Sequence, residues 1–161
     1  MTPRIVGLIS DTHGLLRSEA LTSLQPSDLI IHAGDIGNPE ILDRLSAIAP
    51  VVAVRGNIDK SPWASTLQMT AVVQAGSTVI YVLHNIHDLD RDPAAAGFDV
   101  VVSGHSHNPS QIRRSGVLYI NPGSAGPRRF RLPVTVARLD LSKQPPLIGF
   151  IDLLTADAAS P

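Results

Sequence analysis

Five short apolar runs, each ending abruptly in a polar loop, limit the folds open to this chain more than any other feature of its sequence. The runs occupy residues 5–9, 29–31, 51–54, 79–83 and 100–102. Short apolar stretches bounded by turn residues predict buried strands. The loops that follow them carry Asp11, His13, Asp35, Asn57, His84, His105 and His107. The pattern therefore predicts strands that deliver polar side chains into loops at their ends.

The segments between the first three strands predict helices. Apolar residues recur at helical spacing as Leu15, Leu16, Leu21 and Leu24 in one segment, and as Ile41, Leu42, Leu45 and Ile48 in the other. Asn38 is a suitable cap for the second helix, Pro39 suits its first turn, and Pro50 marks its end. Strands that alternate with helices in this way predict parallel pairing.

Beyond Trp63 the pattern becomes rich in strands. They are predicted over residues 66–73, 77–83, 99–103, 110–114, 117–120, 134–141 and 146–152, with one short helix over 93–96. One open sheet would have to be very wide to hold them all, so two sheets packed face to face with helices outside are expected. We expect a single α/β domain over residues 1–154 and a disordered tail over 155–161.

The composition excludes several classes of protein. The chain of 161 residues has no cysteine, which rules out disulfides, thiolate-bound zinc and iron–sulfur clusters. A net charge of -1 and a pI near 6.6 argue against general nucleic-acid binding. The apolar run at 5–9 is too short for a signal-peptide core or a membrane span, so a cytoplasmic location is the expectation.

The polar loops together predict a metal centre. Ligands of α/β sheets bind beyond the carboxyl ends of the strands, where all five loops are expected to converge. Their carboxylate, amide and imidazole groups suit borderline or hard divalent cations. Alternate residues of an extended segment share a side, so Asp11 and His13 can reach one ion, as can His105 and His107. A carboxylate such as Asp35 can bridge two ions about 3.5–4 Å apart.

Two such ions would give the site its chemistry. They carry more positive charge than Asp11 and Asp35 neutralise, so the site would attract phosphate. Ions of this kind lower the pKa of a bound water from about 15.7 to about 7 and clamp phosphoryl oxygens during in-line displacement. The residues therefore predict hydrolysis of a phosphate ester by an activated water.

The ordered motifs resemble those of the calcineurin-like metallophosphoesterases. They are Ser10-Asp11-Thr12-His13-Gly14, Gly34-Asp35, Gly56-Asn57, His84 and Gly104-His105-Ser106-His107. The small single-domain phosphodiesterase branch, which includes a retromer scaffold subunit, is the most similar, and Asn121-Pro122-Gly123-Ser124 resembles a further signature of it. The resemblance implies a four-layer αββα sandwich with two mixed sheets.

It also implies how the ions are held. One ion would bind Asp11, His13 and His107, the other would bind Asn57, His84 and His105, and Asp35 would be shared. Members of the family commonly use manganese, with iron, nickel, zinc or cobalt substituting, and homodimers are expected.

Two departures from the family pattern concern proton transfer. Many larger members have a histidine that serves as general acid after the Gly-Asn motif, where this chain has Ile58 followed by Asp59. Close relatives usually continue the His84 segment with Gly-His, whereas here the second histidine is His87. His87 is therefore the candidate for a substitute acid, and a solvated or supporting position is the alternative. Without the usual acid, a phosphodiester is favoured over an unactivated monoester as substrate.

Several residues have both a functional and an ordinary interpretation. His13, Asn57 and His87 are the candidate catalytic residues. Arg55 could steer phosphate or lie on the surface, and Asp59 could form a turn or support a metal ligand. Asn121 and Ser124 belong to a predicted tight turn whose amides could face the substrate.

Three further features lie outside the motifs. His32 is interpreted as structural. The arginines at 128, 129 and 131 are typical of a solvated loop. Trp63 could mark an interface or a lid.

The sequence thus predicts a metal-dependent phosphodiesterase for a small phosphate ester. The rival hypothesis is a non-catalytic protein-interaction scaffold on the same fold. Neither a membrane nor a nucleic acid is expected as a partner.

Overall fold

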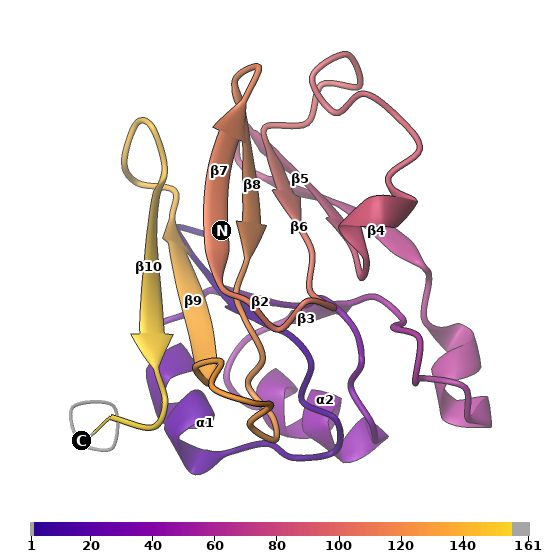
Figure 1. Cartoon of the computed structure of the whole chain (residues 1–161). Coiled ribbons are helices and arrows are strands. Elements are labelled where there is room, and N and C mark those ends of the chain that lie inside the picture. The colour runs from indigo at the N-terminus through magenta and orange to yellow at the C-terminus, as the bar shows by residue number, and fades with distance from the viewer. Residues whose placement is uncertain (1, 156–161) are drawn as a thin grey trace.

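Two five-stranded mixed sheets form the frame of the protein (Figure 1). The computed structural model describes residues 2–155. The first sheet has the strand order β10-β9-β1-β2-β3 and the second has the order β4-β5-β6-β8-β7. The strands are β1 (Ile5–Ile9), β2 (Leu29–His32), β3 (Val51–Ala53), β4 (Thr70–Ala75), β5 (Thr78–Leu83), β6 (Val100–Val102), β7 (Ser110–Arg114), β8 (Val117–Asn121), β9 (Thr135–Asp140) and β10 (Leu147–Asp152). The helices are α1 (Ser18–Leu24) and α2 (Pro39–Ser46), with the 3₁₀ helices η1 (Pro62–Thr66) and η2 (Ile86–Asp88).

The first three strands are parallel, as the alternation of strands and helices predicts. The antiparallel β9 and β10 extend this sheet beyond β1. The helix α2 begins where expected, because the Asn38 side chain accepts a hydrogen bond from the Ile41 amide at 3.3 Å and Pro39 occupies the first turn. The polar loops after β1, β2 and β3 therefore emerge at one edge of the sheet.

The second sheet contains three parallel strands, β5, β6 and β8, between the antiparallel edge strands β4 and β7. The loops after β5 and β6 carry the remaining candidate ligands, His84, His105 and His107. Parallel strands leave their carboxyl ends together, so these loops also gather at one edge.

Apolar side chains fill the space between the sheets, where Leu8 and Ile31 meet Ile80 and Val102. The helices α1 and α2 cover the outer face of the first sheet and pack on Ile9, Ile30 and Val136 among others (Figure 1). The outer face of the second sheet carries a smaller cluster around Tyr81 and Phe98, whose rings stack at 4.7 Å. This confirms the sandwich class, and among the described residues η2 and the loops beside it, not an α-helix, cover that last face.

Two predicted elements are wrong in detail. Residues 93–96 form a turn in which the Phe98 amide donates to the Pro93 carbonyl at 2.9 Å. A helix does not form here because the chain continues almost directly into β6. The strand predicted over 66–73 runs instead over Thr70–Ala75, since Pro62 opens a 3₁₀ helix that extends to Thr66.

Other expectations stay open. The domain boundary at 154 remains a prediction, and the tail predicted over 155–161 lies outside the described residues except for Thr155. Within residues 2–155, no helix has the length and apolar character needed to cross a bilayer.

Candidate metal centre

Unusual backbone conformations mark the loops at the edge of the sheets. Five of the seven non-glycine residues with positive φ in the described chain are candidate ligands. They are Asp11, His13, Asp35, His105 and His107, with φ between 47° and 70°. Side chains rarely adopt this region, and such residues persist where surrounding structure holds them in place. The fold therefore holds the backbone at these positions in a strained conformation that orients the candidate ligands.

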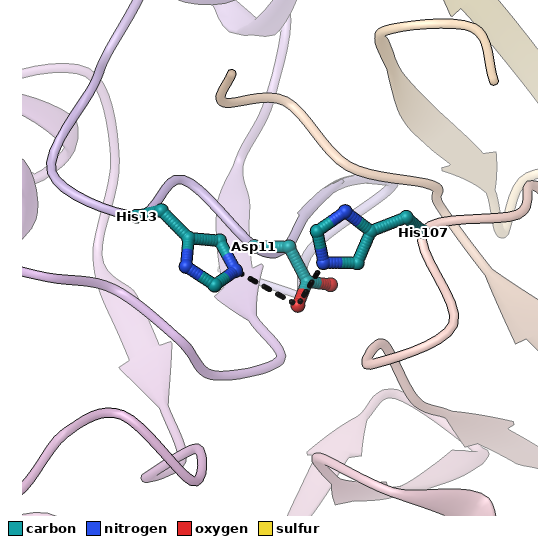
Figure 2. Close-up of side chains that lie close together, drawn as sticks. All are labelled: Asp11, His13 and His107. Atoms are coloured by element: carbon teal, nitrogen blue, oxygen red, sulfur yellow. Dashed lines mark ion pairs between the residues drawn. The ribbon is translucent and has the colours of Figure 1, made fainter. Parts of the chain in front are cut away.

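The first group of donors consists of Asp11, His13 and His107 (Figure 2). The two imidazoles flank one carboxylate oxygen, with Asp11 Oδ1 lying 3.3 Å from His107 Nε2 and 3.7 Å from His13 Nε2. Asp11 is fully buried, and its backbone amide donates to the Gly34 carbonyl at 3.0 Å. The loops after β1 and β6 thus meet at this point.

The second group consists of Asp35, His84 and His105, with Asn57 beside them. Asp35 Oδ2 lies 3.3 Å from His84 Nε2. Asn57 Oδ1 lies 3.0 Å from His84 Nε2 and 3.2 Å from His105 Nδ1. These contacts bring together loops that follow β2, β3, β5 and β6.

Asp35 joins the two groups. Its Oδ2 atom lies 3.5 Å from His13 Nε2 of the first group, while it also contacts His84 of the second. His84 Nε2 in turn lies 3.9 Å from Asp11 Oδ1. All seven side chains named from the sequence therefore form one cluster with Asp35 between its halves.

The donor atoms of the first group are spaced as ligands of one cation would be, and not as partners in a hydrogen bond. Asp11 Oδ1 and His13 Nε2 are buried and lack hydrogen-bond partners among the described residues. Their separation of 3.7 Å is too long for a hydrogen bond. Two ligands about 2.1 Å from one ion stand about 3.0–3.4 Å apart at octahedral or tetrahedral angles. The spacing within both groups lies close to that range.

Charge within the cluster is strongly coupled. Burial opposes ionisation of Asp11, but the neighbouring imidazoles of His107 and His13, together with the hydrogen bond from the Ser10 hydroxyl, outweigh burial and hold the pKa of that carboxyl well below its usual range. Burial likewise opposes ionisation of Asp35, yet His84 and the Ile58 amide lower its pKa. Burial opposes protonation of His84, and the contact with Asp35 raises its pKa nonetheless. Both carboxylates are therefore anionic and ready to bind a cation.

Hydrogen bonds from outside the cluster orient its members. The Ser10 hydroxyl donates to Asp11 Oδ2 at 2.7 Å, and the His105 amide donates to the same oxygen at 3.1 Å. His84 Nδ1 lies 2.8 Å from the Ala33 carbonyl, which can only accept, so Nδ1 carries the proton and Nε2 keeps its lone pair for a ligand. The position of Ser10 directly before the aspartate is the signal in the sequence that could have indicated this role.

Asp59 holds two of the ligand loops together. Its buried carboxylate accepts hydrogen bonds from the backbone amides of Ile36 and Gly37 at 3.0 and 3.1 Å, and from that of Gly56 at 2.9 Å. These amides flank Asp35 and Asn57. The structure thus places Asp59 as a supporting carboxylate beneath the centre, one of its two sequence interpretations.

Asn121 and Ser124 support the loops that carry the other ligands. The Asn121 amide nitrogen donates to the Gly104 carbonyl at 2.9 Å and to the Ser106 hydroxyl at 3.0 Å. The Ser124 hydroxyl donates to the Asp11 carbonyl at 3.0 Å. Both residues therefore brace the site through their side chains.

His32 is a structural residue in a single protonation state. The Gly34 amide donates to its Nδ1 at 3.1 Å, and the Thr12 hydroxyl, which donates to the Ile36 carbonyl, lies 3.0 Å from its Nε2. Nδ1 therefore accepts and Nε2 donates, which describes the neutral ring. Complete burial lowers its pKa to about 4, consistent with that assignment.

Two candidates lie apart from the cluster. His87 is exposed on η2, and its backbone amide donates to the Asn85 side chain at 3.1 Å. The Arg55 side chain donates to the Met69 sulfur at 3.3 Å. The structure therefore shows no contact that ties either side chain to the cluster among the described residues.

Comparisons with known proteins match most of this chain. The family model of the calcineurin-like phosphoesterase superfamily domain matches residues 5–144. A probable metallophosphoesterase of Methanothermobacter thermautotrophicus is 31% identical over 152 residues, which cover 86% of this chain and 88% of the relative.

Two solved structures share the fold at low sequence identity. An archaeal phosphodiesterase superposes with a TM-score of 0.77 at 21% identity, over 91% of this chain and 99% of that one. Vps29 of Chaetomium thermophilum superposes with a TM-score of 0.74 at 18% identity, over 92% of this chain and 97% of that one.

Proposed function

Because this chain belongs to the calcineurin-like phosphoesterase superfamily and has the features of a metal-dependent phosphoester hydrolase, we propose that it is a phosphodiesterase with a dinuclear metal centre. The observation that carries the proposal is the pair of donor groups joined by Asp35, whose Oδ2 lies within 3.5 Å of His13 in one group and His84 in the other. A carboxylate placed between two donor groups can bridge two ions about 3.5–4 Å apart.

The residues present fit two divalent cations. Asp11, His13 and His107 would hold one ion, Asn57, His84 and His105 the other, and Asp35 both. When bound, such ions lower the pKa of a shared water to about 7 and neutralise charge on the phosphoryl oxygens. The mixture of oxygen and imidazole donors, without thiolate, is compatible with manganese, and we propose Mn²⁺, with iron, nickel, zinc or cobalt as substitutes.

Other side chains of the chain would handle the substrate and its protons. The His13 side chain remains 14% exposed at the rim of the cluster. His87 lines the same cavity as His105, so we assign it to protonation of the leaving oxygen. Ile58 has no ionisable group to share this task. Arg55 is assigned to steering the phosphate toward the centre.

This shortage of proton donors favours a phosphodiester as the substrate. A diester substrate carries a single negative charge, and an aryl or similarly acidic leaving group needs little protonation as it departs. The archaeal phosphodiesterase of the same fold supports this choice through its described activity. The remaining expectations, a small phosphate ester as partner, a homodimer and a cytoplasmic location, stay predictions.

The rival function is that of a non-catalytic interaction scaffold, which the likeness to Vps29 keeps open. The strained loops argue against it. Five donors held at positive φ, and buried carboxylates aimed at imidazoles, serve no purpose in a surface that only docks another protein.

Hydrolysis of bis(p-nitrophenyl) phosphate, measured with and without added Mn²⁺, tests the proposal. Asp35→Asn removes the bridging charge while keeping the shape, so we expect kcat/KM to fall at least about 100-fold. Asp43→Asn, an exposed carboxylate on α2, is the matched control and should retain full activity. Negligible turnover by the wild-type protein across Mn²⁺, Zn²⁺, Co²⁺ and Ni²⁺ would favour the scaffold.

A further inference from the structure

A cavity of about 610 Å³ opens beside the candidate metal centre. Gly104, His105 and Asn121 line its inner end. From there it extends over the outer face of the second sheet, between the β7–β8 hairpin and the segment that includes η2. The cavity is therefore continuous with the cluster but reaches well beyond it.

One face of the hairpin forms the floor. In the antiparallel register Ser110 pairs with Asn121 and Ile112 pairs with Tyr119. Residues two positions apart on a strand share a face, so both pairs and Arg114 line up along the cavity. At about 3.4 Å per residue, the Ile112–Tyr119 pair lies about 7 Å beyond Asn121. The backbone of Arg114 lies about 7 Å farther along the strand, and its guanidinium reaches back over the Tyr119 ring, 6.0 Å from the ring centroid.

The middle of this cavity is apolar. Ile112 is 47% exposed in its floor, and Tyr119 lies partly buried beside it. Ile86 and Leu89 form the opposite wall. An exposed isoleucine in a concave, apolar setting leaves surface that a ligand can remove from water.

The fold explains why this surface is open. On the first sheet, α1 and α2 cover the outer face, whereas only η2 and neighbouring loops cover the outer face of the second sheet in the described part of the chain. The short η2 leaves the Ile112–Tyr119 pair uncovered. The loop between β5 and β6 therefore both delivers His84 to the centre and shapes the cavity.

We propose that this cavity binds one ester substituent of the phosphodiester substrate, and that this substituent is a flat apolar ring. The inference rests on the proposed function and adds the class of substrate. A phosphate held at His105 would place its ester oxygen at the inner end of the cavity. A ring attached there extends toward Ile112 and Tyr119, which lie about 7 Å along the strands from Asn121.

The size of the cavity favours a small ester over a protein partner. Ligand pockets for small molecules measure about 300–1,000 Å³ and combine an apolar lining with a few polar groups. This cavity falls within that range, and its lining combines the apolar side chains of Ile86, Leu89 and Ile112 with polar groups that include His105, Asn121 and Arg114. It is therefore suited to a ring that continues from a bound phosphate.

Two non-hydrolysable probes test the proposal. Phenylphosphonate and methylphosphonate present the same anionic head to the Mn²⁺-loaded protein and differ only in the ring. We expect phenylphosphonate to bind about tenfold more tightly by calorimetry, as burial of the ring predicts. Ile112→Ser should abolish most of this difference and leave methylphosphonate binding unchanged. Val72→Ser is the control, because Val72 is also an exposed β-branched residue of the same sheet, at 60% exposure, and lies outside the cavity.

The possible failures are distinguishable. If neither phosphonate binds the Mn²⁺-loaded wild-type protein, recognition of a phosphate group by the metal centre is refuted, and both the proposed function and the cavity proposal fall with it. If both bind equally, the centre stands but the ring site is overturned, and a partner protein becomes the candidate occupant. A loss of methylphosphonate binding in Ile112→Ser, at unchanged thermal stability, also contradicts the proposal, because it would place Ile112 in phosphate binding.

Discussion

The Nε2 atom of His107 lies 3.3 Å from Oδ1 of Asp11, so a side chain that follows β6 of the second sheet meets one that follows the central strand of the first. The same division holds for the whole cluster. The first sheet supplies Asp11, His13, Asp35 and Asn57, and the second supplies His84, His105 and His107. A cation bound here would link the two sheets directly.

Metal binding should therefore stabilise the fold. At a free Mn²⁺ concentration 100 times its Kd, binding to the folded state alone adds about 2.7 kcal/mol. For a chain of this size, that raises Tm by about 5–10 °C. Differential scanning calorimetry with Mn²⁺ and with EDTA measures the shift. His107→Ala should abolish most of it, and an equal shift in this variant would show that the ion binds elsewhere.

Asp59→Ala should loosen the loops that carry Asp35 and Asn57. The change removes the acceptor of three backbone amides, so the metal-free protein should lose about 3 kcal/mol in its free energy of unfolding. Affinity for Mn²⁺ should fall about 10–100-fold, as for other groups that orient metal ligands. Urea unfolding and metal titration measure the two effects. Asp59→Asn keeps one acceptor oxygen and should recover part of both, whereas wild-type metal affinity in Asp59→Ala would refute the supporting role.

Gly104→Ala should displace Asp11. A Cβ atom at this position would collide with the Ser10 hydroxyl and lie 2.7 Å from Asp11 Oδ2, so the carboxylate must move. We expect a loss of about 1–3 kcal/mol of stability together with weaker metal binding. Gly149→Ala is the control, since its Cβ would meet open space and should change stability by less than about 0.5 kcal/mol. Similar behaviour of the two variants would count against a tightly packed site.

The low pKa of His32 leads us to expect that the folded protein loses stability in acid. Burial lowers its pKa to about 4, below the ordinary value of 6.5 that applies to the unfolded chain. Between these values the unfolded chain binds a proton that the folded protein does not, so stability is full above pH 6.5 and decreases as the pH falls toward 4. The contribution is about 3 kcal/mol at 1.36 kcal/mol per unit of pKa.

Urea unfolding of the metal-free protein from pH 7.5 to pH 4.5, with and without the substitution His32→Asn, checks this contribution. The variant keeps an acceptor for the Gly34 amide but has no titrating ring. Its stability should therefore decline less steeply over this pH range. Parallel pH profiles for the two proteins would mean that His32 titrates normally in the folded state.

The local pattern of the sequence determined where several strands and helices lie and which side chains form the cluster. The apolar run at 5–9 identifies a buried strand, and Asn38 with Pro39 locates the start of α2, because these are properties of neighbouring residues. The order of the motifs was enough to name the seven side chains that meet in the cluster. Loops that follow parallel strands must emerge at one edge, so their convergence could be anticipated without coordinates.

Tertiary structure decided what depends on contacts between distant segments. The sequence left Asp59 between a turn former and a supporting carboxylate, and only the approach of the loops at 36–37 and 56 selected the second role. The cavity over Ile112 and Tyr119 was likewise invisible, since alternation along a strand shows which residues share a face but not what covers that face. Short-range periodicity specifies the elements, whereas the surface left open between them depends on how the whole chain packs.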